Sequence, residues 1–272
     1  MSFKGTSFIF DGIPSTEYGI NSCRIVAGVS QSSGIINSGF TVISDTIGNS
    51  DREILYGATN NTPLEFDLVA YSETELDRYD IASISGWLCG HKTYKILSVV
   101  QDDMDLFRYK CLMGSFENIE IGGRIFGFKV HVRCDSPYAY MPPVVQTMVS
   151  TSTSLPSNFI YNNRSNVNDY YKPESIQIEL GALSNFELSN NTTGESFTLT
   201  FNEEGSQING MNLTITILAN GVMYYSETSP TFNIYKYSNK KFPRFTRGNN
   251  DISIIGNCTV TITSEFPMNI GY

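Results

Sequence analysis

Residues 126–134 read FGFKVHVRC and carry the clearest alternation of apolar and polar side chains in the chain. Successive side chains of a β-strand point to opposite faces, so this alternation predicts a strand with one buried face. The buried face would be formed by Phe126, Phe128, Val130 and Val132. The opposite face would be basic and would carry Lys129, His131 and Arg133. Pro137 ends the pattern, because proline cannot donate a hydrogen bond to a neighbouring strand.

The sequence on both sides of this strand predicts an all-β protein with one helix. Charged residues make up only 17% of the chain, whereas the β-branched and aromatic residues that pack well on pleated sheets are common. Short apolar runs are separated by polar turns, as in residues 95–100 and 106–112. With 272 residues, the chain is long enough for two domains.

The helix is predicted near residues 73–89. Ser72 and Glu75 have the spacing of a capping box, in which the hydroxyl bonds the Glu75 amide and the carboxylate reaches back. Apolar residues then recur at helical spacing, namely Leu76, Ile81, Ile84, Trp87 and Leu88. Gly90 is expected to end the helix.

The composition changes between residues 141 and 171. This stretch is rich in Ser, Thr, Asn and Pro and has no sustained period, which predicts a linker or a mobile loop. It would separate an N-terminal domain, residues 1–140, from a C-terminal domain, residues 172–272. Alternating runs such as 175–180 and 213–217, with Gly and Asn turns between them, predict a β-sandwich for the second domain.

The charge and the cysteines exclude several classes of protein. The net charge of −9 argues against binding of nucleic acid by neutralisation of its phosphates. The simpler interpretation of this charge is a soluble protein whose surface mildly repels its neighbours, and the other is a conduit through which an anionic polymer passes without binding. No apolar stretch of about 18 residues is present and the N-terminus does not resemble a signal peptide, so we expect no membrane insertion. The five cysteines lack any CxxC spacing, which predicts free thiols and synthesis in a reducing cytoplasm.

No motif in the sequence carries a catalytic signature. Cys89 and His91 lie close together, but no neighbouring residue orients the base. The run of Asp102, Asp103 and Asp105 lacks the glycine and glutamate of a calcium loop. We therefore expect no catalytic residue, no metal and no cofactor, and a protein that is not an enzyme. Paired carboxylates, which meet only in space, stay open.

The basic face of the central strand is the one candidate site. Lys129, His131 and Arg133, with Arg124 nearby, form a local basic patch on an acidic protein. A solvated face is the simpler interpretation. The sharper hypothesis is that these four residues form a subunit interface with acidic residues of a neighbouring copy.

Several motifs, in this order, resemble the distal tail proteins of siphophages, which form the hub of the tail tip or baseplate. In the first half they are FIFDG (8–12), PLEFDL (63–68), ISGWL (84–88) and VHVRCDSPY (130–138). In the second half the resemblance rests on KFPRFTRGNN (241–250) followed by Ile252.

This resemblance implies an N-terminal β-barrel-like domain that forms a hexameric ring and a C-terminal galectin-like β-sandwich. It implies a structural protein at the distal end of the virion tail, in contact with the tail-tube protein and the tail-associated hub protein. A receptor-binding protein is a further candidate partner. DNA would pass through the channel of the ring without specific binding.

Two other functions stay open. The galectin-like domain could be a carbohydrate-binding module for host recognition, in which strand tyrosines stack on sugar rings: Tyr224, Tyr225, Tyr235 and Tyr237. Packing inside the domain is the commoner fate of such residues. A tail-associated glycan hydrolase is the third alternative.

Overall fold

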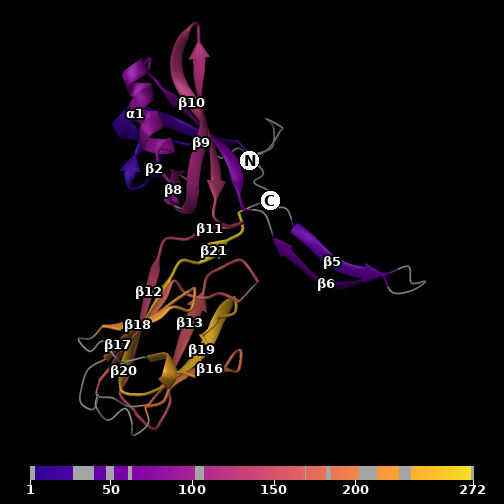
Figure 1. Cartoon of the computed structure of the whole chain (residues 1–272), viewed down its shortest axis with the longest axis vertical. Helices are drawn as coiled ribbons and strands as arrows, with labels where there is room; N and C mark the ends of the chain where they lie inside the picture. Colours follow the sequence, from indigo (N-terminus) through magenta and orange to yellow (C-terminus); the bar gives the residue numbers. More distant parts are fainter. Residues whose placement is uncertain are drawn as a thin grey trace. The chain divides into compact units, whose positions relative to one another are not determined.

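The computed structural model describes residues 4–26, 40–46, 52–60, 63–101, 107–168, 170–181, 185–201, 213–226 and 234–270. These residues form two compact units (Figure 1). Unit 1 comprises Met1–Met141 and Met268–Tyr272, and unit 2 comprises Pro142–Pro267. Strands dominate both units and α1 (Arg78–Cys89) is the one α-helix among the described residues, so the predicted fold class is confirmed.

Unit 1 is built on an eight-stranded antiparallel sheet. Its strand order is β1 (Lys4–Gly5), β4 (Ile20–Val26), β7 (Glu65–Ser72), β10 (Arg124–Cys134), β9 (Tyr109–Ile121), β8 (Lys95–Val100), β2 (Ser7–Phe10) and β3 (Ile13–Pro14). The strands β1 and β3 are its two edges. The barrel-like domain is therefore an open sheet in the described part of the chain.

The sequence FGFKVHVRC lies in β10, at the centre of this sheet. From Phe128 onward the predicted alternation is observed, with Phe128, Val130 and Val132 fully buried. Gly127 pairs with Tyr71 of β7, and a Cβ atom at this position would lie 2.4 Å from the carbonyl oxygen of Ala70. Only glycine fits this close approach of two backbones. The register shifts between Ile125 and Gly127, and Phe126, which the alternation placed on the buried face, is only partly buried.

Helix α1 begins later than predicted. Its N-cap is Asp77, whose carboxylate accepts hydrogen bonds from the amides of Tyr79 and Asp80, while Asp80 bonds back to the Asp77 amide. The predicted capping box at Ser72 is therefore wrong, because Ser72 is the last residue of β7 and its hydroxyl accepts a bond from the Thr74 amide.

The apolar face of α1 packs on unit 1 through Trp87. The indole stacks between the rings of Phe8 and Tyr18, with centroid distances of 5.6 and 4.6 Å. Its Nε1 donates to the carbonyl oxygen of Phe10 at 3.3 Å. The indole ring of Trp87 is thus packed against other aromatic rings, and its N–H group has a hydrogen-bond acceptor.

Unit 2 is a β-sandwich. One sheet has the order β12 (Val144–Ser150), β20 (Cys258–Ser264), β14 (Ser175–Leu180), β17 (Leu213–Leu218) and β18 (Met223–Ser226). The other has the order β13 (Ser157–Asn163), β19 (Gly248–Ile255), β15 (Phe186–Asn190) and β16 (Glu195–Leu199).

The linker predicted at residues 141–171 is wrong, because β12 and β13 lie within it. Its polar residues are compatible with strands since their side chains find partners inside the sandwich. The hydroxyl of Ser150 lies 3.1 Å from that of Ser157, and the Tyr161 hydroxyl lies 2.7 Å from the Ser264 hydroxyl. Composition alone does not reveal such pairs, because the two partners lie on strands of different sheets and meet only in the folded sandwich.

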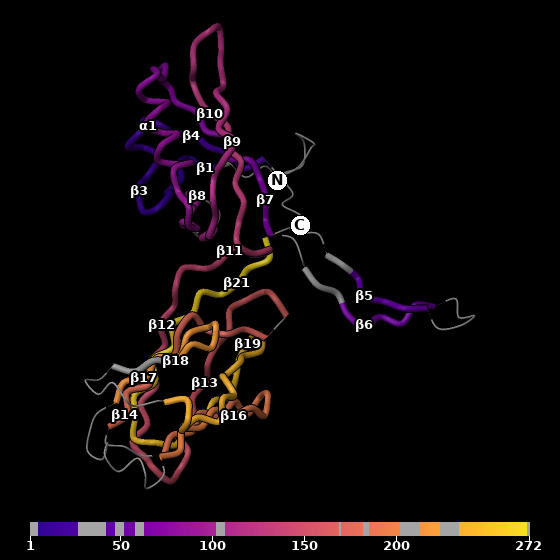
Figure 2. The backbone as a smooth tube through the Cα atoms, in the orientation of Figure 1, coloured from indigo at the N-terminus to yellow at the C-terminus, as the bar shows by residue number. Residues whose placement is uncertain are grey.

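The chain passes between the two units twice. Strand β11 (Ala139–Tyr140) pairs with β21 (Pro267–Met268), and Figure 2 shows these two segments side by side. Beyond β21, Ile270 is buried in the core of unit 1. Unit 2 is therefore an insertion between two segments of unit 1.

Candidate functional surfaces

The four predicted interface residues all meet acidic side chains of the same chain. The Lys129 ammonium lies 3.0 Å from Asp67 and 3.8 Å from Glu117. Arg133 lies 3.3 Å from Glu65.

The remaining two residues have longer or shared contacts. His131 bonds Asp67 at 3.0 Å through Nδ1, and its Nε2 is 3.9 Å from Glu65. Arg124 reaches Glu75 at 3.6 Å. Together these contacts form a charge ladder, defined here as Glu65, Asp67, Glu117, Lys129, His131 and Arg133 on β7, β10 and β9.

Register explains why the charge ladder forms. On antiparallel β7 and β10, His131 lies opposite Asp67 and Arg133 lies opposite Glu65. Directly opposed side chains are close enough to interact. Partial burial raises the pKa of the Asp67 carboxyl, but hydrogen bonds from His131 and Lys129 outweigh this effect, so the pKa lies below its usual value. Hydrogen bonding to Asp67 likewise raises the pKa of Lys129.

A second surface is the hairpin of β5 (Phe40–Thr46) and β6 (Glu53–Asn60), which form a two-stranded sheet of their own. Its exposed apolar side chains are Val42, Ile43, Ile54, Leu55 and Tyr56. Successive strand residues point to opposite faces, so both faces of the hairpin are apolar. Such a hairpin is at best marginally stable in water, and a partner that covered it would stabilise it.

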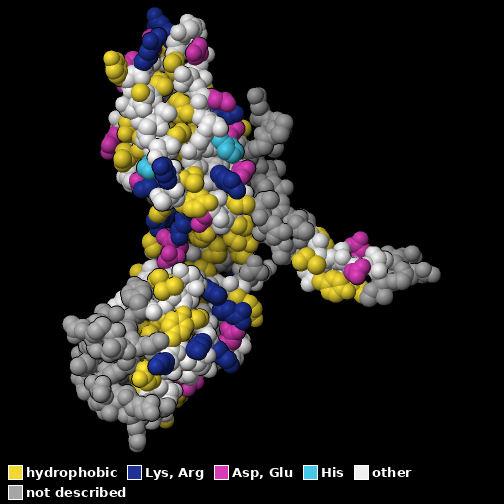
Figure 3. All heavy atoms as spheres, in the orientation of Figure 1, with side chains coloured by type: hydrophobic (Ala, Val, Ile, Leu, Met, Phe, Trp, Pro, Cys, Tyr) yellow, Lys and Arg dark blue, Asp and Glu magenta, His cyan; other side chains and the backbone are white. Residues whose placement is uncertain are grey.

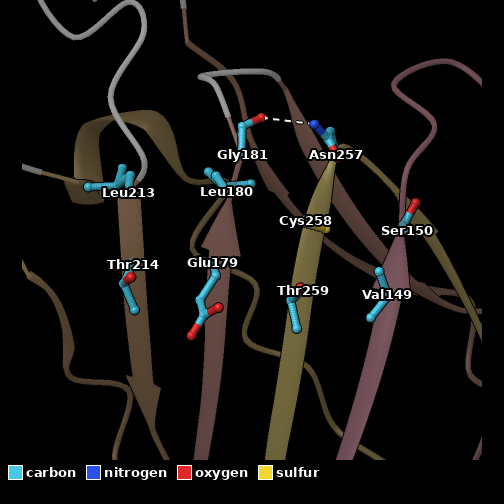
Figure 4. Close-up of a pocket in the computed structure, with 10 residues that line it drawn as sticks. All are labelled: Val149, Ser150, Glu179, Leu180, Gly181, Leu213, Thr214, Asn257, Cys258 and Thr259. Carbon is cyan, nitrogen blue, oxygen red and sulfur yellow. Dashed lines mark hydrogen bonds between the residues drawn. The ribbon is translucent and has the colours of Figure 1, made fainter.

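A third feature is a cavity of about 290 Å³ at one end of the five-stranded sheet of unit 2 (Figure 4). Its lining residues are Val149, Ser150, Glu179, Leu180, Gly181, Leu213, Thr214, Asn257, Cys258 and Thr259. Asn257 donates to the Gly181 carbonyl oxygen at 3.3 Å. Glu179 is the single carboxylate of this lining, and burial raises the pKa of the Cys258 thiol to about 11. Among the residues that the structure describes, the lining thus lacks both a carboxylate pair and a reactive thiolate.

The other residues considered for chemistry have structural partners. The Nε2 atom of His91 lies 2.8 Å from the carbonyl oxygen of Trp87, and burial raises the pKa of the Cys89 thiol. Asp102, Asp103 and Asp105 lie outside the described residues. In the described ranges, no three His, Cys, Asp or Glu side chains are grouped so that they could hold a metal ion.

Two family models match most of the chain. A family model described as the N-terminal domain of a phage tail protein matches residues 3–136. A second, described as the C-terminal domain of a phage tail protein, matches residues 138–264. The chain belongs to this phage tail protein family. No curated protein is significantly similar to it in sequence.

Solved structures show the fold of this tail protein. The Dit protein of phage SPP1, described as a paradigm of the hub adsorption apparatus in phages that infect Gram-positive bacteria, aligns with a TM-score of 0.63. The identity is 13%, over 96% of this chain and 98% of the other. A phage P2 baseplate structure covers 89% of this chain and 90% of its own, at 10% identity and a TM-score of only 0.42. The expected resemblance to distal tail proteins is thus confirmed in fold by the SPP1 Dit structure, and the family models confirm a family of phage tail proteins.

Two of the tyrosines proposed to stack on sugars are packed within unit 2 of the tail protein. The Tyr235 hydroxyl donates to the carbonyl oxygen of Gly221, and its ring lies against Phe242. The ring of Tyr237 lies 5.4 Å from that of Phe201. The side chains of Tyr224 and Tyr225 are outside the described set.

Sequence reasoning missed the hairpin and one exposed aromatic residue, Tyr170. The hairpin strands could have been found from the apolar runs at 40–43 and 54–56. Tyr170 lies in the stretch taken for a linker, beside the basic segment around Arg244. Within the described part of the chain, no helix has the length and apolar character that a membrane crossing requires.

Proposed function

We propose that this tail protein is a structural component of the distal tail tip and assembles into a ring of six copies. The ring would join the tail-tube protein to the tail-associated hub protein, leave a channel for DNA, and offer a site to a receptor-binding protein. The chain would be made in the host cytoplasm and act as a structural part of the virion, not as an enzyme. The family match and the fold support this assignment.

The observation that best supports assembly into a ring is the set of exposed apolar side chains on the β5–β6 hairpin. A chain with a net charge of −9 repels its own copies, so association needs a favourable contact that charge does not supply. Burial of exposed apolar side chains provides about 25 cal/mol per Å². The hairpin strands β5 and β6 also offer edges to which a neighbouring strand can pair.

The mass in solution, followed by negative-stain images, tests the ring. We expect a species near six times the chain mass of 30.3 kDa. Leu55→Asp should abolish it, because Leu55 is 66% exposed on the hairpin and its replacement leaves the fold intact. Leu155→Asp is the matched control, since Leu155 is 70% exposed on unit 2. Equal assembly of both variants would argue against the hairpin contact.

The surface made of the charge ladder and Arg124, which holds the four predicted residues, stays a proposed subunit interface. Its ion pairs are made within the chain, so a neighbouring copy would meet charges of both signs rather than a basic patch. Arg124 is the most exposed of the four predicted residues, and its nearest acidic group, Glu75 at 3.6 Å, is farther away than the nearest acidic group of any of the other three. Arg124→Glu should therefore weaken assembly without unfolding unit 1, and unchanged assembly would remove this residue from the interface.

A second candidate function is carbohydrate binding by unit 2. The observation that favours it is Tyr170, whose side chain is 55% exposed beside the guanidinium of Arg244. Exposed aromatic rings stack on the apolar faces of sugars, and here a cation lies within reach of the same ligand.

A further inference from the structure

The basic residues of unit 2 are segregated. All seven lie in two short segments, 164–174 and 236–247: Arg164, Lys172, Lys236, Lys240, Lys241, Arg244 and Arg247. These segments hold only two acidic residues, Asp169 and Glu174. The rest of unit 2 has eight acidic residues and no Lys or Arg. Exposed charges are screened beyond about 8 Å at physiological salt, so the local charge decides which ligand is attracted.

The fold joins the two segments. Tyr171 and Phe245 form a β-bridge in which each amide donates to the other's carbonyl oxygen at 2.9 Å. Both of these side chains are buried in unit 2. Side chains alternate along extended backbone, so the flanking residues Tyr170, Lys172 and Arg244 face outward together.

Arg244 and Tyr170 form the centre of this outward face. The guanidinium lies 4.5 Å from the centroid of the Tyr170 ring, and Glu195 holds it through two hydrogen bonds. A bidentate pair fixes the guanidinium plane, so Arg244 covers one face of the ring in a defined orientation. The exposure of Tyr170 leaves ring surface open to a ligand.

Two lysines flank this centre in the sequence, Lys172 two residues after Tyr170 and Lys241 three residues before Arg244. Lys172 and Lys241 are exposed, and Arg244 is the one basic residue of unit 2 that forms an ion pair among the described residues. Arg247 is held by a hydrogen bond of 3.3 Å to Asn168. In Figure 3, dark-blue Lys and Arg side chains gather around hydrophobic ones on the visible face of unit 2. Tyr170, Lys172, Lys241, Arg244 and Arg247 are named the Tyr170 surface below.

We propose that the Tyr170 surface binds an anionic polysaccharide whose repeating units carry carboxylate or phosphate groups. This inference rests on the second candidate function and names its ligand class. The open ring of Tyr170 would stack on a sugar, while Lys172, Lys241 and Arg247 would contact successive negative groups. Nucleic acid fits less well, because platforms for single strands use several aromatic rings for successive bases, and Tyr170 is the one exposed ring in this surface.

Calorimetric titration of the full chain tests the ligand. The probe is a short polygalacturonate chain, and its methyl ester is the matched neutral polymer. We expect the acid to bind, the ester to bind at least about tenfold more weakly, and rising salt to weaken binding of the acid. Equal binding of the ester, or no binding of either polymer, would overturn the inference. Equal or tighter binding of an oligothymidylate of the same charge would also overturn it.

Variants locate the site. The double variant Lys172→Gln, Lys241→Gln and the single variant Tyr170→Ala should each lose about tenfold in affinity. Lys92→Gln makes the same kind of change on an exposed lysine of unit 1 and should bind like the parent chain. Loss of binding in Lys92→Gln, or full binding in the double variant, would contradict the assignment. Light scattering on the same samples separates the two proposals, since a ring that forms without binding the polymer refutes only the ligand.

Discussion

The Nδ1 atom of His131 lies 3.0 Å from the Oδ1 atom of Asp67, and the two residues are direct register partners on β10 and β7. Asp67 also accepts a contact of 3.0 Å from Lys129. The Asp67 carboxylate thus contacts two basic side chains of β10, a central strand in the sheet of unit 1. The basic face predicted from the sequence is therefore balanced within the chain.

Asp67 should make the stability of the protein depend on pH. Its pKa is lower in the folded than in the unfolded chain, so its contribution is present above the unfolded pKa of about 3.9 and is lost as the pH falls through the folded pKa. The loss should be roughly 0.5–1 kcal/mol, because the pair is partly exposed. Asp67→Asn should remove this part of the pH dependence in urea unfolding between about pH 5 and pH 3. Asp251→Asn, at an exposed carboxylate, should leave it in place.

Trp87→Ala should lower the unfolding free energy by roughly 3–5 kcal/mol, because it empties the space between Phe8 and Tyr18. Thermal melting followed by circular dichroism measures the loss. Tyr79→Ala on the same helix is the control, since Tyr79 is 84% exposed. Equal melting temperatures for the two variants would show that α1 is not packed through Trp87.

Asp77→Ala should cost about 1 kcal/mol, because two helix amides lose their acceptor. Ser72→Ala should cost less, since the Ser72 hydroxyl bonds a turn and no helix amide. Chemical denaturation of both variants compares the two positions. A larger loss at Ser72 would restore the capping box that the sequence predicted.

Some elements of this fold follow from the local sequence, and others depend on residues that meet only after folding. The strand at 126–134 and the burial of Trp87 could be predicted, because apolar period depends on neighbours a few residues away. The helix start could not be fixed between Ser72 and Asp77, since both have an acidic residue three positions later. The strands at 144–163 were missed because Ser150 and Tyr161 gain their partners only in the folded sandwich.

The same distinction applies to the candidate site. The basic residues of β10 could be predicted from the sequence. The acidic residues that pair with them lie on β7 and β9, and the register between these strands and β10 cannot be predicted from a local pattern. The Tyr170 surface joins segments about 70 residues apart through the bridge of Tyr171 and Phe245. The sequence shows that Lys and Arg are confined to two segments of unit 2. Recognising this requires the correct boundaries of unit 2.

Ile270 should anchor the C-terminal segment in unit 1. It is 5% exposed and packs in the core of that unit after the chain has returned through β21. Ile270→Ala should therefore destabilise unit 1 by roughly 2–4 kcal/mol, whereas Ile160→Ala, on an exposed position of unit 2, should have little effect. Hydrogen exchange resolved by peptide measures where the loss falls. Faster exchange in β7 and β10 is expected for Ile270→Ala, and a change confined to β12 and β20 would mean that the terminus stabilises unit 2 instead.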